Sequence, residues 1–188
     1  MRPADTRHRG PHPADNQLFA SQWVPVLRRA VGELSWLLTR GYPPSATLKL
    51  VSDRYALTER QRWAVGRAAC PDELRARRAT TLLPPGNLGG RPVAIDGFNL
   101  LITLETALGG GVVLRGRDGA LRDLSSIHGT YRAVQETDRA IRLAASALQV
   151  LKPGPCGRCS TNPCRTAAGW RRACASWGPR SAYPGRPK

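Results

Sequence analysis

The last part of the chain lacks the residues from which a protein core is built. Residues 152–188 contain no Leu, Ile, Val, Met or Phe, and no Asp or Glu. A segment without apolar periodicity has no face to pack against a core, so we expect this one to be a disordered tail. It carries eight Lys or Arg, which is half of the chain's formal charge of +16.

The chain also lacks signals for export and for membrane insertion. Its first ten residues contain no apolar stretch of the kind found in secretory signals. No apolar run approaches the roughly 18 residues that a membrane helix needs. We therefore expect a cytoplasmic protein with reduced thiols and no membrane partner. With 188 residues and 41% hydrophobic composition, the chain can still bury a core.

Acidic residues are scarce, with 13 Asp and Glu against 29 Lys and Arg. A sequence pI near 11.2 points first to RNA or DNA as a partner, because Lys and Arg displace counterions from phosphates. Residues 1–151 carry a more moderate +8, so the strength of this argument depends on whether the tail is genuine.

Four of the five cysteines lie in the tail: Cys156, Cys159, Cys164 and Cys174. They could form a zinc site that starts from the pair Cys156 and Cys159, although the irregular later spacing disfavours zinc. The tail could also be a basic arm that binds nucleic acid. The third interpretation, which we prefer, is that the tail is translated in a shifted reading frame.

The shifted frame can be tested on the amino-acid sequence. Residues 159–178 can be encoded, with freely chosen wobble bases, so that reading one base earlier gives VLDQPVSNSGRLAARLRELG. That peptide has an apolar run ending in Asp, a turn and an amphipathic helical pattern. Such a strand, acid, loop and helix unit is not expected of an arbitrary frame.

The first half of the chain predicts a helical module at 15–70, after a loose segment at 1–14. Apolar residues recur at spacings of three and four up to about Arg40, and Pro25 either kinks this helix or marks its true start. Thr58 and Gln61 have the spacing of a capping box that opens another helix. A helical hairpin is preferred over a helix-turn-helix, and the arginines of this region suit either phosphates or solvent.

A Pro/Gly-rich connector at 71–90 separates this module from an α/β domain at 91–151. The run Pro92–Ile95 predicts a strand that ends in Asp96, and Asn99 is expected to cap the helix that follows. Open α/β sheets place their ligand sites at the carboxyl ends of strands. Asp96 is therefore the first candidate site residue, although Asp-Gly is also ordinary turn chemistry.

Two further acids are candidates. Asp118 follows a second strand at 111–114, where it is either a site acid or a turn residue. A helix from about Thr130 to Leu151 places Asp138 near its apolar stripe when Val134 sets the origin. Because an unpaired buried carboxylate is costly, Asp138 needs a partner, an ion or an edge position. Glu136 falls on the outer face and is expected to be solvated.

Several segments together resemble an uncharacterised prokaryotic family that pairs an N-terminal helical module with a PIN/NYN-like nuclease domain. The segments that carry the resemblance are Arg40–Pro43, Asp53–Tyr55, Arg60–Arg62, Ala94–Asn99, Arg115–Gly119 and His128–Arg132. The resemblance covers about residues 17–151. It implies an α/β fold in which the helical module precedes a PIN-like, Rossmann-like α/β/α domain, here incomplete.

The resemblance also implies a chemistry. PIN-like nucleases gather acids that hold Mg²⁺ or Mn²⁺, which activates water and neutralises charge on the scissile phosphate. By this resemblance Asp96, Asn99 and Asp138 are the expected catalytic residues, and Asp96, Asp138 and Asp118 the expected metal ligands. The family continues with a segment of the form LDxPVSNSGRL, which this chain lacks and which the shifted frame supplies.

We therefore expect a metal-dependent nuclease for RNA or DNA, inactive where its last acid is missing. The alternatives are a non-catalytic nucleic-acid-binding protein, which needs no metal, and a zinc-binding protein that uses the tail cysteines. A phosphatase of the Asp-x-Asp type is disfavoured, because Phe98 occupies the position of the second Asp.

Overall fold

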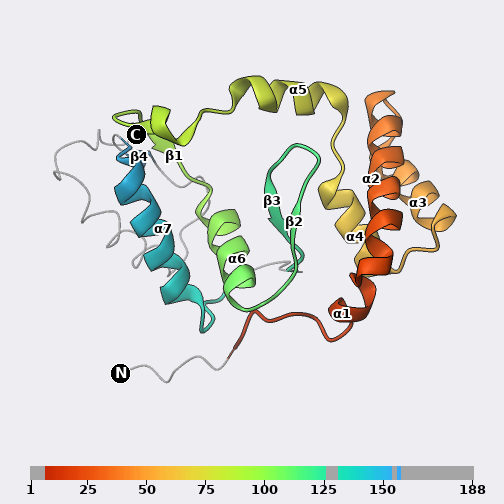
Figure 1. Ribbon diagram of the computed structural model, residues 1–188, viewed down its shortest axis with the longest axis horizontal. Helices are drawn as coiled ribbons and strands as arrows, with labels where there is room; N and C mark the ends of the chain where they lie inside the picture. The colour runs from red at the N-terminus through yellow and green to blue at the C-terminus, as the bar shows by residue number, and fades with distance from the viewer. Residues whose placement is uncertain (1–6, 126–130, 154–155, 158–188) are drawn as a thin grey trace, which may run out of the picture. The chain divides into compact units, whose positions relative to one another are not determined.

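The chain has a mixed α/β fold, seen in a computed structural model that describes residues 7–125, 131–153 and 156–157 (Figure 1). It divides into two compact units. One unit comprises residues 10–82 and 109–126, and the other comprises residues 1–9, 83–108 and 127–188. We call them the helical unit and the α/β unit. No helix among the described residues is long and apolar enough to cross a bilayer.

The helical unit begins with two short turns, α1 (Asp15–Leu18) and the 3₁₀ helix η1 (Ser21–Trp23). The long helix α2 (Val24–Thr39) follows, with Pro25 in its first turn. Proline is well tolerated at that position because its missing N–H would be unpaired there anyway. Pro25 therefore marks the start of α2 rather than a kink in a longer helix.

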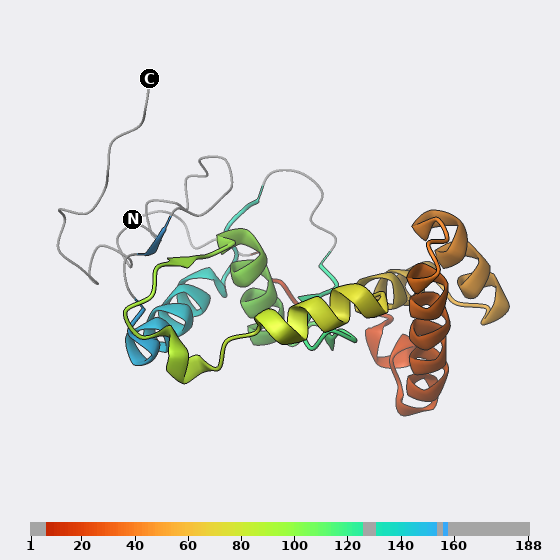
Figure 2. The same cartoon turned by 90° about the horizontal axis from the view of Figure 1, so that it is seen from above.

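Helices α3 (Pro44–Arg54) and α4 (Glu59–Ala68) pack against α2. The capping box predicted at Thr58 is present, since Thr58 accepts from the Gln61 backbone and Gln61 accepts from the Thr58 backbone. The three helices enclose a core of Ala30, Leu34, Val51, Leu57 and Val65. In both views α2 and α3 lie side by side (Figures 1 and 2).

The predicted connector is partly helical. Helix α5 (Asp72–Thr81) occupies much of it, with the 3₁₀ helix η2 (Pro85–Leu88) further on. The acids Asp72 and Glu73 lie in the first turn of α5 and Arg78 in the last, which suits the helix dipole. All of α5 is exposed or nearly so.

The helical unit also contains a β-hairpin, which the sequence predicts to belong to the α/β domain. Strands β2 (Val113–Arg115) and β3 (Leu121–Asp123) pair in antiparallel register. The backbone N–H of Arg117 donates to Ala68 O at 2.8 Å, and Arg60 Nη1 donates to Leu124 O at 3.3 Å. These bonds attach the hairpin to α4, so residues 91–151 do not form one continuous domain.

The α/β unit is built on two helices that pack side by side, α6 (Gly97–Leu108) and α7 (Thr137–Leu151) (Figures 1 and 2). Strand β1 (Val93–Ala94) precedes α6 and pairs in parallel with β4 (Cys156–Gly157). A parallel pair needs a crossover connection, and residues between β1 and β4 provide one that includes both helices.

Strand β4 lies in the segment that we expected to lack regular structure. That expectation is wrong at Cys156 and Gly157, which pair with Val93 and Ala94. The rest of the predicted tail, from Arg158 onward, lies outside the described residues. The zinc interpretation of the cysteines depends on that part of the chain.

Candidate functional site

The strand-end acid is in the expected place. Strand β1 ends at Ala94, and Asp96 immediately precedes the first residue of α6. Asp96 Oδ1 accepts from the backbone N–H of Asn99 at 3.3 Å, which is the hydrogen bond of an N-cap. Asp96 is exposed, so its carboxylate begins the helix and still faces solvent.

Asn99 does not cap the helix as predicted. It lies inside α6, and its side-chain Nδ2 donates to Asp96 Oδ2 at 2.6 Å. Asp96, not Asn99, therefore caps the helix. Asn99 fixes the orientation of the Asp96 carboxylate, because the two residues share two hydrogen bonds across one helical turn.

The parallel pairing of β1 with β4 defines the edge at which Asp96 lies. In this register Ala94 pairs with Gly157, so both strands run toward the same edge. Carboxyl ends of neighbouring parallel strands are where α/β proteins gather ligand-binding groups. The residues that follow Gly157 in the sequence are therefore the ones to examine for a site at Asp96, and they lie outside the described residues.

Asp138 lies in the first turn of α7 and is exposed. Of the three alternatives, a partner, an ion or an edge position, the structure shows the edge position, although Val134, which set the origin, precedes the helix. The buried positions of α7 are Thr137, Ala140 and Ala144. Asp138 therefore needs no partner. Within the described residues, no hydrogen bond or ion pair joins it to Asp96.

Asp118 is engaged elsewhere, in the turn of the β-hairpin of the helical unit. Its carboxylate accepts from Arg122 Nη1 at 2.8 Å and from Arg122 Nη2 at 2.6 Å, and it pairs with Arg78 as well. These hydrogen bonds, from Arg122 above all, outweigh the cost of burial and hold the pKa of Asp118 well below its usual range. A carboxylate so occupied is a structural link, and Asp118 is withdrawn as a metal ligand.

The described residues do not complete a metal site. They contain no group of three or more His, Cys, Asp or Glu placed to hold an ion. Asp96 offers one carboxylate oriented by Asn99, whereas a site for Mg²⁺ ordinarily needs one or two carboxylates and further oxygen ligands. Asp96 is thus a candidate ligand within an incomplete set.

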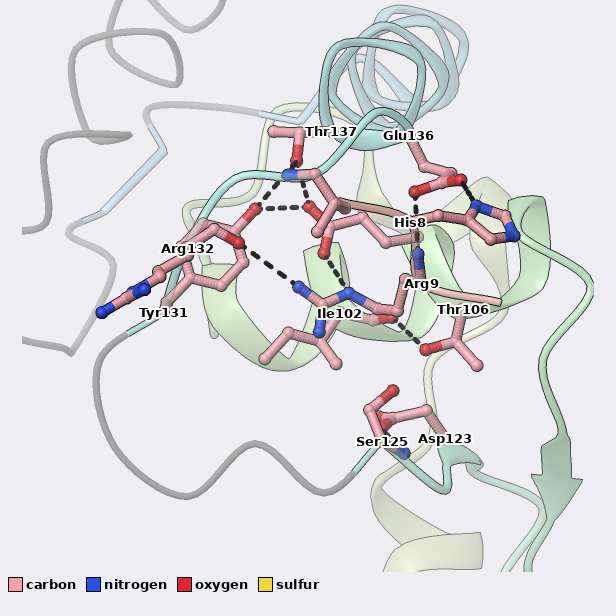
Figure 3. A network of polar contacts seen from close by, with 12 residues as sticks. His8, Arg9, Ile102, Thr106, Asp123, Ser125, Tyr131, Arg132, Glu136 and Thr137 are labelled. Carbon is pink, nitrogen blue, oxygen red and sulfur yellow. Dashed lines mark hydrogen bonds and ion pairs between the residues drawn. The ribbon is translucent and has the colours of Figure 1, made fainter. Parts of the chain in front are cut away.

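A buried polar network lies between α6 and α7, and the sequence did not predict it (Figure 3). At its centre is Glu105 of α6, which is fully buried. Its Oε1 accepts from Thr137 Oγ1 at 2.6 Å and from the Tyr131 hydroxyl. Burial and this hydrogen bond to Glu105 raise the pKa of Tyr131 well above its usual range. Tyr131 therefore stays a neutral donor.

Residues 8 and 9, which we call the N-terminal segment, complete this network. Arg9 Nε donates to Glu105 Oε2 at 2.8 Å, and the side chain of Arg9 is only 12% exposed. His8 Nδ1 contacts Glu136 Oε1, and the Arg9 backbone N–H donates to Glu136 Oε2 at 3.2 Å. Figure 3 shows His8 beside Glu136 at the start of α7, with Arg9 next to His8.

Glu136 is consequently not the solvated residue that we predicted. It immediately precedes α7, and its side chain is 10% exposed. Desolvation raises the pKa of Glu136, but the hydrogen bonds from His8 and from backbone N–H groups outweigh it, so the pKa is lowered overall. Glu136 holds the N-terminal segment to the beginning of α7.

Two family models match the chain, one for each part. "Protein of unknown function (DUF434)" matches residues 26–80, and "Domain of unknown function (DUF5616)" matches residues 85–160. The first range covers the main helices of the helical unit. The second covers the α/β unit up to β4 and includes the hairpin that packs against α4.

An uncharacterised protein of the archaeon Methanocaldococcus jannaschii, MJ0935, is 29% identical over 126 residues. The aligned region covers 67% of this chain and 59% of the relative, so the chain spans less than two thirds of the relative's length. No solved structure matches the chain.

Proposed function

We propose that this chain is a metal-dependent nuclease whose catalytic set is incomplete, and that it acts on RNA or DNA in the cytoplasm when that set is restored. The observation that supports the proposal most is the parallel pairing of β1 with β4 beside Asp96. This pairing places the carboxyl ends of two parallel strands at one edge, and α/β proteins gather ligand-binding groups at edges of this kind.

The reading-frame hypothesis gives this edge its missing acid. In the shifted frame, Val, Leu and Asp replace Cys159, Ser160 and Thr161. Because Ala94 pairs with Gly157, continuing the register in the restored chain sets position 159 opposite Asp96. The restored Asp then follows two residues later, about 7 Å further along the strand.

The family match is consistent with a change of frame at this point. The DUF5616 match ends at residue 160, and the shifted frame begins at position 159. The short strand β4 comes just before that position. The end of the match close to position 159 supports the hypothesis that the residues beyond it are out of frame.

The described residues supply one half of the proposed chemistry. A divalent cation held by Asp96 and the restored acid would neutralise charge on a scissile phosphate. For this chain as written we assign Asp96 the role of ligand and Asn99 the role of orienting its carboxylate. We retain Asp138 as a proposed second acid, since it is exposed in the same unit.

The experiment compares three proteins on labelled single-stranded RNA and DNA with Mn²⁺: the chain as written, the frame-restored chain, and the restored chain with Asp96→Asn. The proposal predicts cleavage by the restored chain only. Asn keeps the capping oxygen of Asp96, so loss of activity in Asp96→Asn reports on charge rather than on folding. Cleavage that is unchanged by Asp96→Asn would remove Asp96 from the mechanism.

A further inference from the structure

Helix α2 has a glycine in its interior that the chain's own packing does not explain. Gly32 lies in the middle of the 16-residue helix, where alanine would be more stable. A Cβ added at Gly32 would meet no atom within 4 Å. Gly66 of α4 offers a contrast, because a Cβ there would lie 3.3 Å from Leu48 Cδ2. Packing thus accounts for Gly66 but not for Gly32.

Two surface hollows meet at Gly32. The first, of about 520 Å³, lies between α2 and α3 and includes Trp36, Leu50 and Arg54 in its wall. The second, of about 460 Å³, lies between α2, α4 and β2, and includes Phe19, Leu27 and Leu114. Both are mainly apolar, and each contains one aromatic side chain. The missing Cβ at Gly32 leaves the helix backbone open to a ligand that occupies both hollows.

The charge beside the second hollow suits an anion, whereas Arg54 in the wall of the first is paired with Glu33, which also lines it. The helical unit contains fourteen Lys or Arg and eight Asp or Glu, a net charge of +6. Within the described chain, six of its arginines form no ion pair: Arg28, Arg29, Arg40, Arg75, Arg77 and Arg115. Arg28 and Arg115 line the second hollow, together with Arg117, which pairs with Asp72.

The aromatic side chain of the first hollow is already associated with a guanidinium group. Trp36 is 53% exposed, and the guanidinium of Arg40 lies 3.5 Å from the centre of its ring. An exposed indole beside an unpaired arginine is the kind of surface on which a nucleobase stacks next to its phosphate. A fatty-acid-like anion would need one hollow and one charged group, whereas this surface has two hollows and several arginines that form no ion pair with any described residue.

We propose that the helical unit binds single-stranded nucleic acid along α2, with one unpaired base in each hollow and the connecting phosphates near Arg28 and Arg115. The inference rests on the proposed function only in identifying the polyanion as nucleic acid. Duplexes are excluded because their bases are stacked and paired, and so cannot enter the hollows.

The test uses the full chain in EDTA, so that no metal-dependent step takes part. A fluorescein-labelled single strand of about 12 nucleotides is titrated by fluorescence anisotropy, beside a duplex of the same sequence. Gly32→Leu fills the junction of the hollows and is expected to weaken single-strand binding by at least ~5-fold, the loss of about one stacked base. Ala46→Leu, which adds a side chain at an exposed position of α3, leaves binding unchanged.

Gly32→Ala separates binding from folding. It is expected to raise the Tm by roughly 2–4 °C, because alanine favours the helix, and yet to weaken binding. A variant that is more stable but binds less tightly cannot be explained by damage to the fold. If Gly32→Ala and Gly32→Leu both bind as wild type does, the inference is wrong.

Charge reversals provide a matched pair. Arg28→Glu with Arg115→Glu should weaken binding more than Arg75→Glu with Arg77→Glu, although both pairs change the net charge equally and remove unpaired arginines. The tail is present in every variant, so its contribution cancels. Equal losses in the two pairs, or duplex binding as tight as single-strand binding, would indicate nonspecific attraction and overturn the inference.

The outcomes distinguish this inference from the proposed nuclease. Gly32→Leu should leave Mn²⁺ binding to the restored chain unchanged, since Asp96 lies in the other unit. Binding without cleavage in the restored chain would count against the nuclease alone. Cleavage that persists in Gly32→Leu with unchanged affinity would count against the α2 surface alone.

Discussion

The carboxylate of Glu105, fully buried in α6, accepts a hydrogen bond from Arg9 Nε at 2.8 Å. The two residues are separated by almost a hundred positions in the chain. Thr137 and Tyr131 donate to the other oxygen of Glu105. Glu105 thus joins α6, the start of α7 and the N-terminal segment. The stability of the α/β unit depends on the hydrogen bonds and the ion pair that this buried carboxylate makes.

Arg9→Met should destabilise the α/β unit by about 3 kcal/mol, because it leaves Glu105 buried without its cation. The measurement is hydrogen exchange at the amides of α6, which reports on this unit rather than on the helical one. Adding Glu105→Gln to Arg9→Met should recover part of the loss, since the amide removes the unpaired charge. Arg132→Ala is the control, since its side chain is exposed and only its carbonyl contacts Arg9. Equal protection in Arg9→Met and wild type would contradict the assignment.

Asp96→Ala should destabilise α6 by about 1 kcal/mol, while Asp96→Asn should change stability little. The reason is that Asn keeps an oxygen able to accept from the Asn99 backbone, and Ala does not. Urea denaturation of the two variants separates the capping role of Asp96 from any role of its charge. If Asn is as destabilising as Ala, the carboxylate does more for the fold than cap the helix.

Asp118→Asn should destabilise the helical unit by about 1–3 kcal/mol at pH 7, because Arg78 and Arg122 lose a charged acceptor. The pKa of Asp118 is lowered in the folded state, so its contribution is present above its usual value of 3.8 and is lost as pH falls below it. The gap between wild type and Asp118→Asn should therefore narrow from about pH 5 downward. Tryptophan fluorescence follows it, since Trp23, Trp36 and Trp63 lie in this unit. A gap that is independent of pH would show that Asp118 contributes only through packing.

The nucleotide sequence around codons 148–160 should show that one inserted or deleted base restores the frame. Reading on from that base should give an apolar run that ends in Asp, followed by a helical pattern. A gene in which no single-base change yields this peptide would contradict the frame hypothesis and return the tail to the zinc and basic-arm interpretations.

Local signals in the sequence predicted local structure well. The capping box at Thr58 opens α4, and the strand before Asp96 leads directly into a helix. Both the capping box and the turn from strand to helix depend on a few neighbouring residues. The backbone hydrogen bonds that these residues must satisfy are the same in any fold. The start of α7 was missed because apolar residues before Thr137 continue a helical spacing in a stretch that is not helical.

Long-range pairing could not be predicted in the same way. Asp118 looked like a strand-end acid, but Arg78 approaches it from α5, forty residues away. Glu105 is the one charged residue of the apolar helix α6, and no residue near it in the sequence indicates that Arg9 is its partner. A lone acid in an apolar run was a usable signal that a buried partner exists, although it does not say which residue that is.

Isothermal titration of Mn²⁺ into the chain as written and into the frame-restored chain tests most directly whether Asp96 and the restored acid form one metal site. We predict that the restored chain binds Mn²⁺ at least ~10-fold more tightly, and that Asp96→Asn abolishes this gain. Equal affinity in the two chains, or a gain that survives Asp96→Asn, would contradict the claim that Asp96 and the restored acid form one metal site.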